Sequence, residues 1–308
     1  MKRMKKLKTP HGTVTFPAFM PVTTFGDKYP LDRMVRPYLG RVSQCLMVSY
    51  HYAQEMKQRP TMPLFIDSGG FAGLFEGVVF TDCGDHACIQ TADGKVLDPL
   101  EILEFQMRNA DIGATLDFII PPGLPEDECR RRRDLTIKNA LYAKKHLADG
   151  KLVLFASLQC WDEESARHSA KIYSDAGFDG IAVGGMVPRA KDREYIKMVV
   201  RAVREEAPRC LIHVFGCGNP DLIPELIEAG ADSFDSSSYI RKAADKAGSG
   251  SGMHAGMYEA IKQLYQIEDV IKEVSNALCE EVDSSTAAKF ATVQGQYEMT
   301  VPNYWVTG

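Results

Sequence analysis

The alternation of short apolar runs with longer amphipathic stretches constrains this chain more than any other feature of its sequence. Strands are expected at Ala18–Val22, Cys45–Ser49, Leu64–Asp67, Thr115–Ile120, Leu152–Leu158, Gly180–Val183, Cys210–Phe215 and Ala231–Phe234. Helices are expected around 53–59, 98–111, 126–149, 162–176, 191–207 and 219–229. Strands that alternate with helices form a parallel sheet, and eight such strands close into a barrel. We therefore predict an α/β fold, a (β/α)8 TIM barrel.

Three segments depart from this alternation. Residues 77–95 are rich in Gly, Asp and Thr, and we expect them to form a β-hairpin inserted after the third strand. Residues 248–252, Gly-Ser-Gly-Ser-Gly, have the composition of a flexible linker, engineered or natural, or of a glycine-rich loop. We divide the chain into a barrel domain (1–247), this linker or loop, and a C-terminal appendage (253–308). The appendage is expected to be a long helix, about 254–282, with a strand-like tail, 290–306, packed on the barrel.

Composition and charge exclude several classes of protein. The chain is 45% hydrophobic and 25% charged, which is typical of a globular protein, and its apolar runs are too short to span a bilayer. The basic N-terminus leads into no apolar signal core, so we expect a cytoplasmic protein with reduced thiols for its 8 cysteines. A net charge of -5 gives no global attraction to phosphate. Any nucleic-acid binding must therefore come from local basic patches, such as Arg130–Arg133, although a solvated helix face explains that run equally well.

Polar residues stand where the expected strands end, which is where barrel enzymes place their active sites. The set comprises Asp67, Ser68, Asp117, Gln159, Gly184, Gly185, Met186 and Asp235. Any one of the carboxylates could instead be a helix cap or a turn residue. Phe71 and Phe215 are candidates to stack on a flat ligand, or are core aromatics. Because three carboxylates and an amide converge on one barrel mouth, we expect a catalytic pocket.

The chain also resembles the queuine and archaeosine tRNA-guanine transglycosylases from about residue 9 to 245. Ordered motifs carry the resemblance: Thr9-Pro10-His11-Gly12, Phe16-Pro17-Ala18-Phe19-Met20-Pro21-Val22, Asp67-Ser68-Gly69-Gly70-Phe71, Gly177-Phe178-Asp179-Gly180, Val183-Gly184-Gly185, Gly216-Cys217-Gly218-Asn219-Pro220-Asp221-Leu222 and Phe234-Asp235. The resemblance implies a pentosyltransferase that exchanges guanine in a nucleic acid for a 7-deazaguanine base such as preQ0.

The roles of individual residues follow from this resemblance. Asp235 is implied to be the nucleophile that attacks the sugar C1′ and forms a covalent intermediate, and Asp67 to be the general acid and base. Asp235 must stay ionised to attack, whereas Asp67 must gain and lose a proton near neutral pH, so we expect the pKa of Asp67 to be raised relative to that of Asp235. The remaining residues are implied to bind the base: Asp117, Gln159, Ser68 and the Gly184-Gly185-Met186 segment at its edge, and Phe71 and Phe215 on its faces.

The resemblance fails after the last barrel strand. The tRNA enzymes carry a Pro-Thr-Arg motif there, followed by a zinc site of three cysteines and a histidine. Here Asp235 is followed by Ser236-Ser237-Ser238, and only Cys279 and His254 remain beyond it. We therefore expect the zinc subdomain to be lost and no cofactor to be bound. Two other groups have ligand chemistry, but Cys83, His86 and Cys88 lack a clear fourth ligand, and Cys210, His213 and Cys217 point in different directions along a strand.

Loss of the tRNA module with both aspartates kept is similar to the DpdA branch of this family, which inserts 7-deazaguanine into DNA. DNA is therefore the expected polymer, with Arg241, Lys242 and Arg130–Arg133 as candidate phosphate contacts. Three alternatives stay open: a tRNA-modifying enzyme, a non-catalytic nucleic-acid-binding subunit of the same fold, and an unrelated barrel hydrolase, lyase or nucleosidase. A homodimer and accessory proteins are further possible partners, by analogy with the family.

Overall fold

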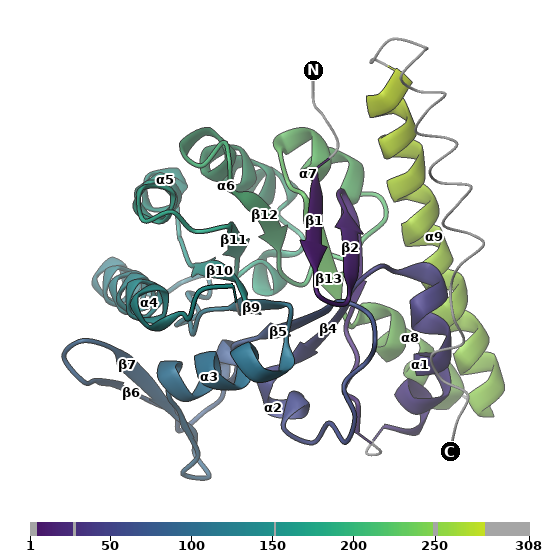
Figure 1. The fold of residues 1–308 in the computed structure, drawn as a ribbon, viewed down its shortest axis with the longest axis horizontal. Helices are drawn as coiled ribbons and strands as arrows, with labels where there is room; N and C mark the ends of the chain where they lie inside the picture. The colour runs from purple at the N-terminus through teal and green to yellow at the C-terminus, as the bar shows by residue number, and fades with distance from the viewer. Residues whose placement is uncertain (1–4, 27–28, 151, 249–251, 281–308) are drawn as a thin grey trace.

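Eight parallel strands form the barrel at the centre of the computed structural model, which describes residues 5–26, 29–150, 152–248 and 252–280 (Figure 1). The strands are β3 (Ala18–Pro21), β4 (Leu46–Ser49), β5 (Leu64–Asp67), β9 (Ile112–Ala114), β10 (Val153–Leu158), β11 (Gly180–Val183), β12 (Leu211–Val214) and β13 (Ser233–Ser236). Neighbours in the chain are neighbours in the sheet, and β13 pairs with β3. A bridge between Val22 and Met47 joins β3 to β4. The predicted α/β barrel is therefore confirmed.

Helices surround the barrel on its outer side (Figure 1). They are α1 (Pro30–Val42), α2 (Tyr50–Ala53), α3 (Pro99–Asn109), α4 (Glu126–His146), α5 (Glu163–Asp175), α6 (Arg193–Glu206), α7 (Ile223–Ala229) and α8 (Ser238–Lys246), with short 3-10 turns η1 (Gly70–Leu74) and η2 (Val187–Arg189). Local signals explain where several begin. Asp98 accepts hydrogen bonds from the backbone of Leu100 and Glu101 at the start of α3, and Asp162 forms a capping box with Ser165 at the start of α5.

Two predicted elements are wrong in extent. The fourth barrel strand is Ile112–Ala114 and not Thr115–Ile120, which has no strand pairing although every residue in it is buried. Its alternating Leu116, Phe118 and Ile120 mimic a strand because both faces of this loop are covered. The helix expected at 53–59 is the single turn α2, which ends at Ala53, and α1 was not predicted at all.

The core lies in two places. Side chains such as Met20, Met47, Phe65 and Phe155 fill the barrel interior, and a larger apolar layer separates the strands from the helices. The antiparallel hairpin of β1 (Lys6–Thr9) and β2 (Gly12–Thr15) adds Val14 to the interior cluster and closes the end where the strands begin. The opposite end of the barrel, where the strands finish, is left for the site.

The predicted insertion after the third barrel strand is confirmed and is larger than a hairpin. It contains β6 (Val79–Asp82), β7 (Ala87–Gln90) and β8 (Val96–Leu97), which form a three-stranded antiparallel sheet. In Figure 1 it projects beside α3 and α4. The side chain of Asn139 on α4 binds both the backbone N–H and the carbonyl of Ala87, at 2.7 and 2.9 Å, and so ties the insertion to the barrel.

The C-terminal helix α9 (Gly252–Glu280) confirms the long helix expected at 254–282 and packs along α1 and α8 (Figure 1). Ala260, Leu264, Ile267 and Ile271 are its buried residues. Among the helices described, none has the length and apolar content needed to cross a membrane. The predicted tail at 290–306 and the central residues of the Gly248–Gly252 segment lie outside the described residues.

Candidate active site

Asp235 lies at the carboxyl end of β13 and is held by two donors. The backbone N–H of Gly216 donates to its Oδ1 at 2.9 Å, and Nε2 of His213 lies 3.1 Å from the same oxygen. The side chain is 10% exposed. The second carboxylate oxygen has no hydrogen-bond partner among the described residues.

His213 is a candidate functional residue that the pattern of strand ends does not predict. It is fully buried on β12, and its Nδ1 lies 2.9 Å from the Ser233 hydroxyl. A hydroxyl that donates to Nδ1 leaves the proton on Nε2, which then donates to Asp235. Its signal in the sequence is a polar residue inside an apolar strand. The structure does not group His213 with Cys210 and Cys217 into a metal site.

Asp67 lies at the end of β5, across β3 and β4 from Asp235 in the order of the barrel. The backbone N–H groups of Gly69 and Tyr50 donate to its Oδ1 at 2.8 and 3.2 Å. Burial, together with a smaller effect of the charge of Asp235, raises the pKa of Asp67 to about 7 against the hydrogen bonds that lower it. The pKa of Asp67 is therefore raised from its ordinary value, and the carboxyl can exchange a proton near neutral pH.

Asp117 and Gln159 form a hydrogen-bonded pair beside these carboxylates. Nε2 of Gln159 donates to Asp117 Oδ2 at 2.6 Å, and the Ser68 hydroxyl donates to Asp117 Oδ1 at 3.1 Å. Burial raises the pKa of Asp117, against these two hydrogen bonds. Asp117 lies beyond the end of β9, in the buried loop, and not within a strand as predicted. An acceptor carboxylate next to an amide is suited to a base edge that carries N–H groups.

Glycines make room for this pair. A Cβ on Gly184 would lie 2.1 Å from Nε2 of Gln159, and one on Gly70 would lie 2.2 Å from Oδ1 of Asp117. Gly185 adopts a φ of +72° and also approaches the Gln159 amide. Met186 is buried behind it. The predicted base-edge residues are thus brought together in one cluster, with the backbone close to the polar groups.

The two candidate stacking residues have different surroundings. Phe71 is 51% exposed on η1 and meets Phe75 edge-on, with ring centroids 6.2 Å apart. Phe215 is half-buried at the end of β12 and packs against the rings of His213 and Phe65. Phe71 is therefore free to contact a ligand, whereas Phe215 is fixed next to the Asp235 and His213 pair.

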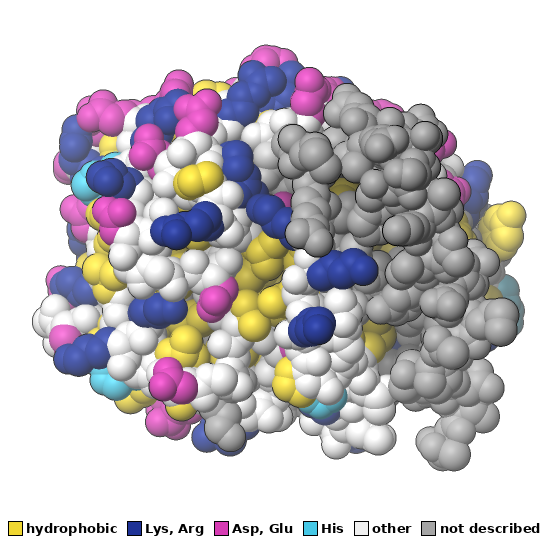
Figure 2. Space-filling model, turned by 45° about the horizontal axis from the view of Figure 1, so that its top comes forward, with side chains coloured by type: hydrophobic (Ala, Val, Ile, Leu, Met, Phe, Trp, Pro, Cys, Tyr) yellow, Lys and Arg dark blue, Asp and Glu magenta, His cyan; other side chains and the backbone are white. Residues whose placement is uncertain are grey.

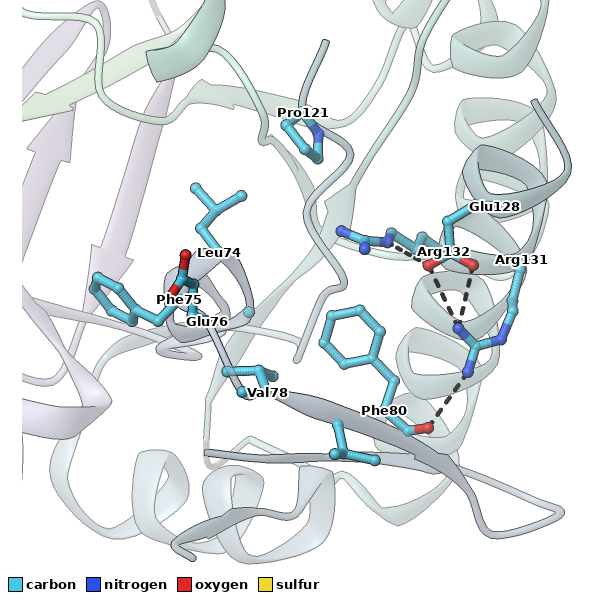
Figure 3. Close-up of a pocket in the computed structure, with 12 residues that line it drawn as sticks. Leu74, Phe75, Glu76, Val78, Phe80, Pro121, Glu128, Arg131 and Arg132 are labelled. Atoms are coloured by element: carbon cyan, nitrogen blue, oxygen red, sulfur yellow. Dashed lines mark hydrogen bonds and ion pairs between the residues drawn. The ribbon is translucent and has the colours of Figure 1, made fainter. Parts of the chain in front are cut away.

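Two open cavities in the described structure have linings that do not include Asp67, Asp117 or Asp235. One, of about 580 Å³, is lined by 73–80, Pro121, Glu128, Arg131 and Arg132 (Figure 3). The other, of about 510 Å³, is lined by residues that include Trp161, Arg189 and Tyr195. Both adjoin residue 121, close after the buried Asp117 loop. Since Asp117 and Gln159 bond to each other, a base that enters between them must break that bond.

The basic residues that are candidate phosphate contacts differ in whether they form ion pairs with acidic side chains. Each arginine of 130–133 has an acidic partner: Arg130 binds Glu126, Arg131 and Arg132 bind Glu128, and Arg133 binds Asp134. Figure 3 shows the two ion pairs of Glu128. Arg241 and Lys242 are exposed on α8, and no ion pair holds them in the described part of the chain. On the face shown in Figure 2, basic and acidic side chains are interspersed. The Arg130–Arg133 run is therefore locally neutralised.

The fold and the site together define a barrel of the enzyme type, with carboxylates and an amide gathered where its strands end. The model of the queuine tRNA-ribosyltransferase family matches residues 1–249. The chain belongs to this family.

Proteins named tRNA-guanine(15) transglycosylase are among its relatives. That of Methanopyrus kandleri is 31% identical over 176 residues, which are 55% of this chain and 38% of the relative. That of Methanothermobacter thermautotrophicus is 30% identical over 246 residues, covering 78% and 36%. That of Methanosarcina barkeri is 25% identical over 270 residues, covering 86% and 52%. The chain thus spans between about a third and a half of the length of these relatives.

Proposed function

We propose that this chain is a nucleic-acid guanine transglycosylase that works through a covalent Asp235 intermediate. One observation carries the proposal: two carboxylates end strands at the same barrel edge, and one of them can exchange a proton near neutral pH. Asp235 is held by Gly216 and His213, and Asp67 has a pKa of about 7. A carboxylate nucleophile and a proton carrier are the pair that a double-displacement reaction at a sugar carbon requires.

The proposed reaction has two steps. Asp235 attacks the sugar C1′ while the bond from C1′ to the guanine nitrogen breaks, and protonated Asp67 gives its proton to the departing base. The incoming base then returns a ring proton to Asp67, and its nitrogen attacks C1′ so that Asp235 leaves as a carboxylate. Two inversions retain the configuration at C1′. The chemistry needs no redox cofactor.

Base recognition is assigned to Asp117 and Gln159, with Ser68 orienting Asp117. A guanine or 7-deazaguanine edge offers ring and amine N–H groups to the carboxylate, and the amide of Gln159 can both donate and accept. The base would replace the 2.6 Å bond that now joins the two side chains. Gly184, Gly185 and Met186 would line the edge, with Phe71 and Phe215 on the two faces.

The polymer is proposed to be tRNA first, with DNA as the second candidate. The names of the relatives favour tRNA over the DNA expected from the sequence. DNA keeps support from Ser236-Ser237-Ser238, which replace the Pro-Thr-Arg motif after Asp235. Exposed Arg241 and Lys242 on α8, directly after this segment, would contact phosphates of either polymer.

Incorporation of labelled guanine and of labelled preQ0 tests the function and the polymer together. The protein is incubated with tRNA, single-stranded DNA or duplex DNA, and label retained in the polymer is counted. We expect label in tRNA. Label in DNA alone would favour the second candidate. Release of guanine without incorporation would identify a nucleosidase and contradict the proposal.

A further inference from the structure

The tip of the insertion gathers side chains that bind transition metals. Cys83, His86 and Cys88 place one ligand atom each within 4.8 Å of one another, and the two sulfur atoms are 4.0 Å apart. All three lie on or next to the turn between β6 and β7. In the described structure none of the three contacts Asp67, Asp117 or Asp235, so this cluster is separate from the carboxylates at the barrel mouth.

Asp98, at the start of α3, lies outside this group of three but places a carboxylate oxygen near two of its members. Its Oδ2 lies 3.4 Å from the Cys88 sulfur and 3.4 Å from Nε2 of His86. Its other oxygen, Oδ1, caps α3. The carboxylate thus turns one oxygen to the helix and the other to the cluster. From sequence alone Asp98 marked only the start of a helix.

Three of the distances between these four side chains are close to those of a tetrahedral zinc site. Zinc bonds of about 2.3 Å to sulfur and about 2.0–2.1 Å to nitrogen or oxygen give tetrahedron edges of about 3.3–3.8 Å. The three atom pairs at 3.4, 3.4 and 4.0 Å fall on or near these edges. Two thiols, one imidazole and one carboxylate are donors that suit zinc rather than magnesium or calcium.

Two side chains around His86 hold its ring as the neighbours of a metal-binding histidine commonly do. Oδ1 of Asp85 lies 2.6 Å from Nδ1 of His86, on the opposite side of the ring from the nitrogen that faces Asp98. A carboxylate on the far nitrogen orients a metal-binding histidine and makes it more basic. The ring of Tyr142 on α4 packs on the His86 ring, with centroids 4.8 Å apart. The histidine is therefore held in place from two sides.

We propose that Cys83, His86, Cys88 and Asp98 bind one structural zinc ion that fastens the insertion to the start of α3. The ion would join the β6–β7 turn to a barrel helix that lies ten residues beyond Cys88 in the chain. Four protein ligands leave no open position, so the ion has a structural and not a catalytic role. This proposal is independent of the proposed base exchange, and either can fail without the other.

Elemental analysis of the full chain, purified under reducing conditions, tests the site. We expect about one zinc per chain, and replacement by Co²⁺ should give the thiolate charge-transfer band and the visible bands of tetrahedral Co²⁺. Cys83→Ser changes an exposed residue, and Asp98→Asn keeps a side chain that still caps α3. Each should lower bound zinc several-fold and abolish the Co²⁺ bands in a protein that still folds.

Cys129→Ala is the matched control, since Cys129 is a buried thiol on α4 outside the cluster. It should keep its zinc. A chelator should lower the melting temperature of the wild type and of this control, and leave that of Cys83→Ser unchanged. Equal zinc in wild type and Cys83→Ser, no zinc uptake by the reduced wild type, or a Cys83–Cys88 disulfide in freshly purified protein would overturn the proposal.

Discussion

Two aspartates at one barrel edge differ because their surroundings differ. Both accept two hydrogen bonds, Asp235 from Gly216 and His213 and Asp67 from the backbone of Gly69 and Tyr50, but burial and a neighbouring charge raise the pKa of Asp67 to about 7. Hydrogen bonds to a carboxylate favour its charged form, and loss of water disfavours it. The same side chain can therefore serve as nucleophile in one position and as proton carrier in the other.

Asp67→Asn should stabilise the protein at high pH. The unfolded carboxyl loses its proton near pH 4 and the folded one near pH 7, so stability falls as the pH rises between these values. Each pKa unit is worth about 1.4 kcal/mol, which gives at most about 4 kcal/mol above pH 7, and about 1–2 kcal/mol after allowance for solvent at the mouth. Urea unfolding at several pH values measures this. The gain should shrink towards pH 4, and a gain independent of pH would contradict the assigned pKa.

His213→Phe should lower kcat and leave KM for the nucleic acid nearly unchanged. The substituted ring can still pack against Phe65 and Phe215, but the hydrogen bond to Asp235 is lost. A hydrogen bond to a charged group is worth about 1.5–3 kcal/mol, or about 10–100-fold in rate. Ser233→Ala removes only the bond that orients His213 and should cost less. An unchanged kcat in His213→Phe would show that the histidine does not position the nucleophile.

Sequence reasoning found the residues that stand at strand ends and missed those whose role depends on pairing. Asp67 and Asp235 follow apolar runs directly, so their place at the barrel mouth follows from the strand pattern. His213 reaches Asp235 and Ser233 only because β12 and β13 pair with His213 opposite Ser233. Asp98 reaches Cys88 and His86 only because the insertion folds back on α3. The local sequence shows neither the register in which β12 pairs with β13 nor the way in which the insertion folds back on α3.

At the scale of elements, loops after the strands carry the base-edge cluster. Gln159 follows β10, Gly184 follows β11, and Asp117 lies on a buried loop after the short strand β9. The strand predicted at 115–120 is wrong because a loop that is covered on both faces shows alternating apolar residues. The early end of β9 lets the chain turn Asp117 towards Ser68 and Gln159.

Gly184→Ala should weaken base binding without unfolding the barrel. The added Cβ would lie 2.1 Å from the Gln159 amide and 3.2 Å from Asp117 Oδ2, so it would displace the amide. We expect affinity for free guanine, measured by calorimetry, to fall by about 10–100-fold, with an unchanged circular dichroism spectrum. Gly40→Ala on α1, where the nearest atom is 3.6 Å away, is the control and should bind as the wild type does. Equal affinity in both variants would place the base elsewhere.

At the scale of the whole molecule, α9 covers α1 and α8 on the outside of the barrel. Its buried face of Ala260, Leu264, Ile267 and Ile271 extends the apolar layer between strands and helices. The insertion at β6–β8 follows β5 and this helix follows α8, so the two additions come from distant parts of the chain.

Leu264→Ala should destabilise the entire protein and not α9 alone. Leu264 is 2% exposed, and truncation of such a residue costs about 2–4 kcal/mol. Thermal unfolding should remain one transition at a lower temperature. Tyr265→Ala, at a position 44% exposed on the same helix, should change the melting temperature much less. Two separate transitions in Leu264→Ala would show that α9 unfolds independently of the barrel.

Trapping of the covalent intermediate tests the central claim most directly. Wild-type protein and Asp235→Asn are each incubated with guanine-containing tRNA and DNA, denatured, and examined for a protein–nucleic acid adduct. The account predicts an adduct with the wild type and none with Asp235→Asn, together with at least about a 1000-fold loss of base exchange. An adduct that persists in Asp235→Asn, or a wild type that forms none with either polymer, would contradict it.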